Sequence, residues 1–168
     1  YRAAAGASWS STTLLPAGAS IPARGFYLVS STTAAGGYTG AATPDFVARS
    51  STGSVKALSY AATGGNVRLG LPGASTSMPN TDPFISDAVA YGTGLYGEGT
   101  AAPVGGWGST GPYLGASIER KASATSTPAS MSGGEASAGN ARDSNDNSAD
   151  WVTRATREPQ NTSSMPEP

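Results

Sequence analysis

Short runs of apolar residues, separated by long polar or glycine-rich stretches, carry the structural signal of this chain. Residues 26–29 are aromatic or branched, which suits a strand, and both faces of that strand are apolar. Such a strand is typical of the interior of a sheet. In residues 67–71 and 85–91 apolar and polar side chains alternate, which predicts two strands with one buried face each. On this pattern we expect Val67, Leu69 and Leu71 to share the buried face.

Weaker strand patterns occur at residues 55–60, 117–121 and 151–154. The sequence Thr43-Pro44-Asp45 is typical of the start of a short helix, with a threonine cap and a proline in the first turn. Long periodic helical segments are lacking in the sequence. We therefore predict an all-β fold, a β-sandwich with long Gly/Ser/Ala-rich loops and at most one short helix. The predicted core residues are Phe26, Leu28, Val67, Leu69, Val89 and Ile118.

Composition narrows the function classes. The 168 residues fit one domain, and 10 basic residues nearly balance 11 acidic ones. Nucleic-acid binding is not indicated, because the basic residues form no patch. The sequence has no window of the roughly 18 apolar residues that a membrane span requires.

Six sequence blocks give the chain a family resemblance. They are LPAG (15–18) with IPARGFYLV (21–29), GNVRL (65–69), DAVAYG (87–92), EG (98–99), SIER (117–120) and DSNDNSADW (143–151). In this order they resemble the bacterial, extracellular branch of the lamin tail domain family. The resemblance implies an immunoglobulin-like β-sandwich. Bacterial relatives look like secreted or surface modules, often attached to exported nucleases or phosphatases, and the animal domain binds proteins and DNA.

The resemblance implies a lamin-tail-like domain over residues 1–158 and an extended tail over 159–168. The family pattern opens with one or two further strands before the position of Trp9, and this chain lacks them. The chain also starts at Tyr1 without a methionine, which we interpret as a processed or truncated product. An unpaired sheet edge is a template for a strand from another chain, so self-assembly by strand addition is one expectation. The other is that the missing strands belong to the same polypeptide.

An acidic segment at 143–150 suggests a cofactor. Its first five residues match the D-x-[DN]-x-[DN] start of a calcium loop, and calcium favours such mixed oxygen donors. Ser148 stands where a glycine belongs and Arg154 where the bidentate glutamate belongs, which excludes an EF-hand. The candidate ligands of a different calcium site are Asp143, Asn145, Asn147 and Asp150. The alternative is an Asx-rich turn that binds its own backbone and orients Trp151.

Three aromatic residues in the glycine-rich stretch, Tyr96, Trp107 and Tyr113, are candidates for stacking on a sugar. The alternative is that they fold inward and anchor the loop. Two acidic residues nearby have plainer expected roles. Asp87 is expected to form a salt bridge with Arg120 or Arg68, or to cap a strand, and Glu98 to be a solvated turn residue.

Enzyme functions are poorly supported. The chain has no histidine and no cysteine, so it cannot form a Ser-His-Asp or Cys-His arrangement or a histidine-ligated zinc site. We expect a non-enzymatic structural or adhesive module of a secreted or surface-displayed bacterial protein, with itself or another surface protein as partner. The alternatives are a carbohydrate- or surface-ligand-binding module, or an accessory domain of a larger exported hydrolase.

Overall fold

The computed structural model describes residues 1–4, 6, 8–9, 15–31, 38, 40–50, 52–56, 58, 60–76, 82–104 and 117–168. Its contacts divide the chain into two compact units. Unit 1 comprises Tyr1–Ser10 and Tyr60–Arg157, and unit 2 comprises Ser11–Ser59 and Glu158–Pro168. The described residues form a mostly β structure of small sheets, which confirms the predicted β-rich class.

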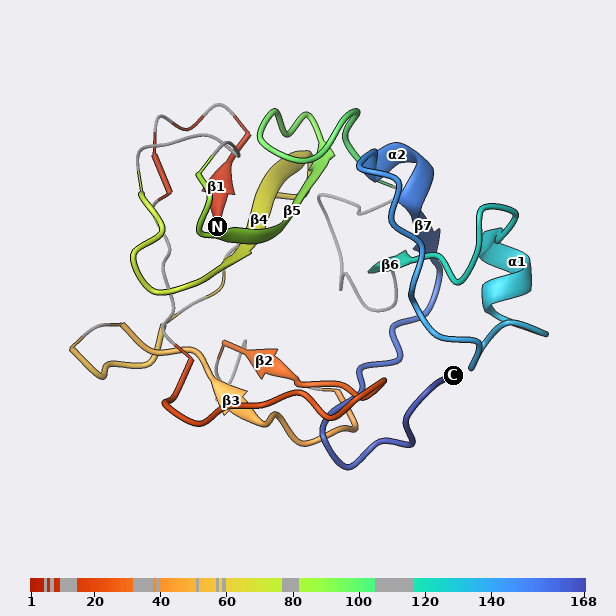
Figure 1. The fold of residues 1–168 in the computed structure, drawn as a ribbon, viewed down its shortest axis with the longest axis horizontal. Coiled ribbons are helices and arrows are strands. Elements are labelled where there is room, and N and C mark those ends of the chain that lie inside the picture. The colour runs from red at the N-terminus through yellow and green to blue at the C-terminus, as the bar shows by residue number, and fades with distance from the viewer. Residues whose placement is uncertain are drawn as a thin grey trace. The chain divides into compact units, whose positions relative to one another are not determined.

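The largest sheet lies in unit 1 and contains strands β1 (Arg2–Ala3), β4 (Gly64–Gly70) and β5 (Ile85–Gly92). Its order is β1-β4-β5 and both pairs of neighbours are antiparallel, as the adjacent ribbons in Figure 1 show. The two predicted strands at 67–71 and 85–91 are therefore confirmed as elements. The first begins earlier than predicted, at Gly64.

A second sheet in unit 1 pairs β6 (Ser117–Arg120) with β7 (Trp151–Arg154), and the two strands are antiparallel. The strands predicted at 117–121 and 151–154 are therefore confirmed as elements. Helix α1 (Pro128–Met131) has Thr127 as its cap, and α2 (Asn147–Asp150) is capped by Asp146 and runs directly into β7. The prediction of at most one short helix is wrong, since the described residues contain these two helices. Both are four residues long and follow capping side chains within segments that lack a helical period.

Unit 2 contains a parallel pair, β2 (Val29–Ser30) and β3 (Phe46–Val47). The predicted helix after Thr43 is wrong, because this segment forms β3. The Asp45 carboxylate accepts the N–H of Leu28 at 2.7 Å and does not cap a helix. An aromatic and a β-branched residue follow Asp45 and suit the pleated conformation that this bond holds.

The C-terminal residues of unit 2, expected as an extended tail, bond to earlier parts of that unit. The side chain of Asn161 donates to the carbonyl of Thr43 at 2.8 Å, and the N–H of Thr162 donates to Asp45. The N–H of Glu167 donates to the carbonyl of Arg24 at 2.9 Å.

Over most of its length the β4–β5 hairpin buries the face opposite to the one predicted. The exception is Tyr91, which lies on the predicted face with Val89 and is buried. Val67, Leu69 and Leu71 are 37%, 52% and 58% exposed. The buried side chains are small or polar instead: Asn66 is 0% exposed and Ala88 and Ala90 are 2% exposed. An alternating pattern separates two faces of a strand, but tertiary contacts decide which face is covered.

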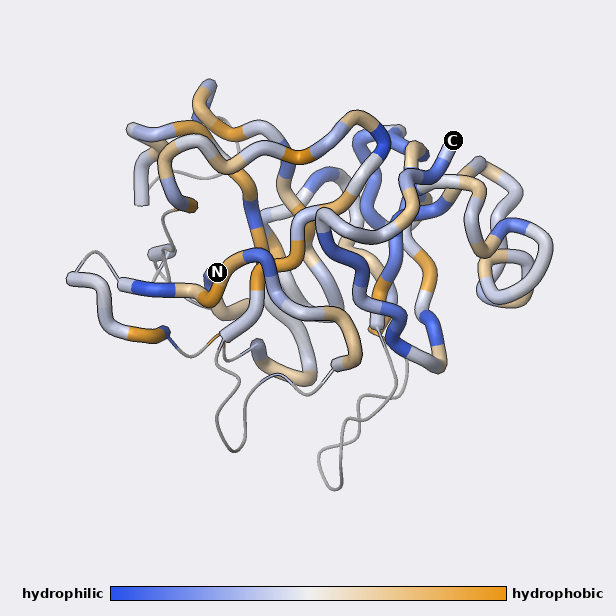
Figure 2. The backbone as a smooth tube through the Cα atoms, turned by 90° about the horizontal axis from the view of Figure 1, so that it is seen from below, coloured by the Kyte–Doolittle hydropathy of each residue, from blue (hydrophilic) through white to orange (hydrophobic). Residues whose placement is uncertain are grey.

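Of the remaining predicted core residues, Phe26, Leu28, Val89 and Ile118 are only half-buried. The buried hydrophobic side chains of unit 1 are Trp9, Ala88, Ala90, Tyr91, Ala102, Met131 and Val152. Figure 2 is consistent with this scattered core, since its apolar stretches are short and interrupted by polar positions. In the described part of the chain, no helix has the length and apolar character needed to cross a membrane.

Candidate functional site

Two fully buried asparagines hold the loop that follows β5. The Asn147 Oδ1 atom accepts the N–H groups of Ala90 and Glu98 at 2.8 and 3.1 Å, and its Nδ2 donates to the carbonyl of Ala88 at 3.2 Å. The Oδ1 atom of Asn66 accepts the N–H of Tyr96 at 2.8 Å. The two side chains therefore fix the loop against β5 and β4.

Backbone bonds join this loop to α2. The N–H of Asn147 donates to the carbonyl of Glu98, and that of Ser148 to the carbonyl of Thr100, each at 2.8 Å. Gly97 permits the close approach, because a Cβ at this position would lie 2.2 Å from both the Ala90 nitrogen and Asn147 Oδ1. We call loop 94–100, together with Asn66 and Asn147, the loop clamp.

The acidic segment at 143–150 folds as a hydrogen-bonded turn. The fully buried carboxylate of Asp150 accepts the N–H and hydroxyl of Ser144, each at 2.7 Å, and pairs with Arg142 Nε at 3.2 Å. Burial works to raise the pKa of Asp150, but the bonds from Ser144 and the charge of Arg142 outweigh it, and the pKa is lowered. Asp150 is therefore an ionised acceptor that closes the turn before Trp151.

This geometry matches the Asx-rich turn, the alternative interpretation of the segment. The oxygens of Asn147 and Asp150 already accept hydrogen bonds, and Asn145 and Asp143 lie exposed in the same turn. Among the described residues, acidic, histidine and cysteine side chains form no group of three that could hold a metal. The calcium assignment stays a prediction, which calorimetric titration with calcium tests directly.

Arg120 links the turn to β5. Its guanidinium bonds Asp87 at 2.6 Å, lies 3.7 Å from Asp143, and stacks on the Trp151 ring at 5.0 Å from the ring centre. The predicted salt bridge of Asp87 with Arg120 is thus confirmed.

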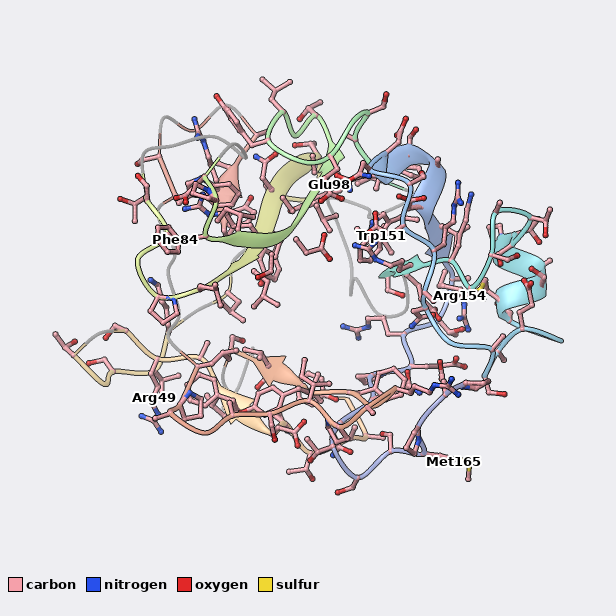
Figure 3. The ribbon with its side chains drawn as sticks, viewed as in Figure 1. Arg49, Phe84, Glu98, Trp151, Arg154 and Met165 are labelled. Atoms are coloured by element: carbon pink, nitrogen blue, oxygen red, sulfur yellow. The ribbon has the colours of Figure 1, made fainter. Side chains whose placement is uncertain are left out.

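Glu98 is not the solvated turn residue that the sequence predicts. It is half-buried, and its Oε2 atom is sealed from solvent without a hydrogen-bond partner. Burial raises the pKa of Glu98, and the negative charges of Asp87 and Asp143 raise it further. Figure 3 labels Glu98 on the loop after β5 and Trp151 at the start of β7.

Of the three aromatic residues predicted to stack on a sugar, the structure describes only Tyr96, because Trp107 and Tyr113 lie outside the described residues. The buried guanidinium of Arg2 stacks on the Tyr96 ring, 3.5 Å from its centre. Arg68 stacks on the buried Trp9 in the same way, at 4.1 Å. These rings are held by cation–π contacts within unit 1.

Sequence reasoning missed the role of both clamp residues. Asn147 is singled out by the calcium pattern but acts on Ala90 and Glu98, which are 57 and 49 positions away. Asn66 follows two glycines, a composition typical of a turn, and yet lies inside β4. No local signal marks either contact.

Comparisons of the chain with protein-family models, curated proteins and solved structures find no match. The lamin tail resemblance therefore stays a prediction from the sequence blocks.

Proposed function

We propose that this chain is a non-enzymatic structural or adhesive module of a secreted or surface-displayed bacterial protein, with an immunoglobulin-like β-sandwich as its fold. The loop clamp carries the proposal. Fully buried amides and a buried carboxylate hold the loops of unit 1 by hydrogen bonds to backbone groups. Preformed loops lose little conformational entropy on binding, which suits a surface that makes contacts.

The charge states of Asp82 and Asp146 support the same function, whereas burial raises the pKa of Glu98. Hydrogen bonds from Phe84 and Ser75 lower the pKa of Asp82, and a hydrogen bond from Ser148 lowers that of Asp146. A catalytic acid needs a pKa raised toward the working pH, so that it holds a proton to give. At neutral pH, Asp82 and Asp146 are instead ionised acceptors whose hydrogen bonds order turns.

Carbohydrate binding is the second candidate, and the cluster of aromatic residues in the glycine-rich stretch favours it. Tyr96 contributes less than predicted, because Arg2 already covers one face of its ring. This candidate therefore depends on Trp107 and Tyr113.

A surface-display experiment tests the proposal. The chain is fused to an outer-membrane carrier on a non-adherent bacterium, and clumping and attachment to protein-coated surfaces are measured. Cells with the carrier alone give the baseline. We expect the chain to promote clumping or attachment, and the purified chain to leave nuclease and phosphatase substrates unchanged.

Two outcomes would contradict the proposal. One is correctly folded, displayed chain that gives neither clumping nor attachment to any protein surface. The other is attachment to glycan-coated surfaces alone, lost in Trp107→Ala, which would support the carbohydrate-binding function. The variant Tyr60→Ala is the matched control for an aromatic residue outside the glycine-rich stretch.

A further inference from the structure

The connection that enters β5 contains an Asp-Pro peptide bond in a constrained turn. Asp82 is 5% exposed and Pro83 is exposed. Phe84, labelled in Figure 3, is the last residue before β5. The nitrogen of an Asp-Pro bond belongs to a tertiary amide, so it leaves as a secondary amine if the bond breaks. The Asp82 carboxyl group is close in the chain to its own main-chain carbonyl carbon.

The fold fixes the Asp82 carboxylate at both oxygens. Oδ2 accepts the N–H of Ser75 at 2.6 Å, and Oδ1 accepts the N–H of Phe84 at 2.9 Å. The Ser75 carbonyl is itself bonded by the guanidinium of Arg68 on β4. The positive charge of Arg68 lowers the pKa of Asp82, and the positive charge of Arg2 lowers the pKa of Arg68.

These contacts favour the nucleophilic form of the carboxyl group. The bonds from Phe84 and Ser75 lower the pKa of Asp82, burial opposes them, and the charge of Arg68 adds to the lowering. The carboxylate therefore stays ionised further into the acid range than an ordinary aspartate. Acid at the same time supplies the proton that the departing nitrogen needs.

The carbonyl of the same bond is also held by a donor. The N–H of Ile85 donates to the Asp82 main-chain oxygen at 3.0 Å. When a nucleophile attacks a carbonyl carbon, negative charge develops on that oxygen, and a fixed N–H donor stabilises it. Nucleophile and oxyanion donor thus belong to one turn.

We propose that the chain cleaves its own peptide bond between Asp82 and Pro83 in acid. A carboxylate oxygen of Asp82 attacks its main-chain carbonyl carbon and forms a cyclic anhydride. The bond from that carbon to the Pro83 nitrogen breaks, and the nitrogen takes a proton from solvent to become a secondary amine. Water then opens the anhydride and leaves Asp82 as a new C-terminal residue. The reaction is a net hydrolysis and needs no oxidant, reductant or cofactor.

The position of the bond decides what the cut chain looks like. It lies between β4 and β5, which are paired along their length. The fragments 1–82 and 83–168 therefore stay associated while unit 1 is folded, and separate on denaturation. This inference does not depend on the proposed structural or adhesive function.

The test compares folded and unfolded chain of identical sequence. Purified chain is incubated at the lowest pH at which its near-ultraviolet circular dichroism is native, with a second sample at that pH in urea. Intact-mass spectrometry measures both products over time. We expect the folded sample to cut at Asp82–Pro83 at least about tenfold faster than the unfolded one, because the fold adds the N–H donor of Ile85 to the attacked carbonyl and keeps the Asp82 carboxylate ionised in acid.

Equal or slower cutting of the folded sample overturns the proposal, as does an intact folded chain. Pro83→Ala keeps the carboxylate and removes the tertiary amide, so it should fold normally and stay intact. Asp82→Asn should abolish the cut. Cleavage of Pro83→Ala at the wild-type rate would show that the proline amide is not the reacting group.

Discussion

The loop clamp gives the strongest quantitative prediction through Asn147→Ala. The substitution removes the acceptor of two N–H groups, those of Ala90 and Glu98, and the donor to the carbonyl of Ala88. All three backbone groups lie in a region where the Asn147 side chain itself is fully buried. Truncation therefore leaves them without these partners in a site with little access to water.

The expected cost follows from these three bonds. An intramolecular hydrogen bond contributes about 1 kcal/mol net, and a buried group left without a partner costs about 1–3 kcal/mol. Alanine favours a helix by a few tenths of a kcal/mol over asparagine, which offsets little. We expect Asn147→Ala to lower the free energy of unfolding by about 3–5 kcal/mol.

Urea unfolding followed by tryptophan fluorescence measures this change, because Trp151 follows α2 directly. Ser148→Ala is the matched control in the same helix; Ser148 is exposed and its side chain bonds only Asp146 among the contacts described. It should cost less than about 1 kcal/mol. Hydrogen exchange of the Ala90 and Glu98 amides should accelerate in Asn147→Ala. A variant within about 1 kcal/mol of wild type, with unchanged exchange at both amides, would refute the clamp.

Three further predictions test the packing and charges of unit 1. Leu69→Ala should cost less than about 1 kcal/mol, because Leu69 is 52% exposed; a loss of about 2–5 kcal/mol in urea unfolding would restore the buried face predicted from the sequence. Gly97→Ala should destabilise the chain by about 1–3 kcal/mol in thermal melting, through the 2.2 Å clash with Ala90 and Asn147, whereas Gly134→Ala, with open space around it, should not. Acidification should have two phases. Because the pKa of Glu98 is raised in the folded chain, the ionised Glu98 side chain destabilises the fold at neutral pH. As the pH falls toward the ordinary pKa of 4.5, Glu98 takes up a proton and the free energy of unfolding should rise. Glu98→Gln should remove this rise. Below pH 3.8, the ordinary pKa of aspartate, the melting temperature should fall, because protonation removes the stability that carboxylates of lowered pKa contribute. A melting temperature that stays unchanged below that pH would contradict these assignments. These carboxylates include Asp82, Asp146 and Asp150.

In unit 1 the sequence predicted the strands better than their environment. The interior strand expected at residues 26–29 is wrong, because only Val29 of that run lies in a strand, β2, and β2 belongs to a two-stranded sheet. Alternation at 85–91 and the compact patterns at 117–121 and 151–154 correspond to β5, β6 and β7, because local side-chain preferences favour extended backbone there. The same alternation could not show that Ala88 and Ala90 face inward, since tertiary contacts decide which face of a strand is covered. The turn at 143–150 was recognised by composition, but the choice between metal and hydrogen bonds rests on where Asp150 points. Such contacts join segments far apart in sequence, and no short pattern encodes them.

The amide of Asn147 stands where the peptide group of a neighbouring strand would stand. It accepts the N–H of Ala90 and donates to the carbonyl of Ala88 along one edge of β5. At the end of the same strand, the carbonyl of Ala102 accepts the N–H of Gly92. An open margin of this kind recruits foreign strands and seeds aggregation. The Asn147 side chain therefore blocks strand pairing at this edge of β5, because it occupies the backbone groups of Ala88 and Ala90. A strand from a second copy could pair here only after α2 had moved away, so growth of an assembly by strand addition would have to proceed from another part of the molecule.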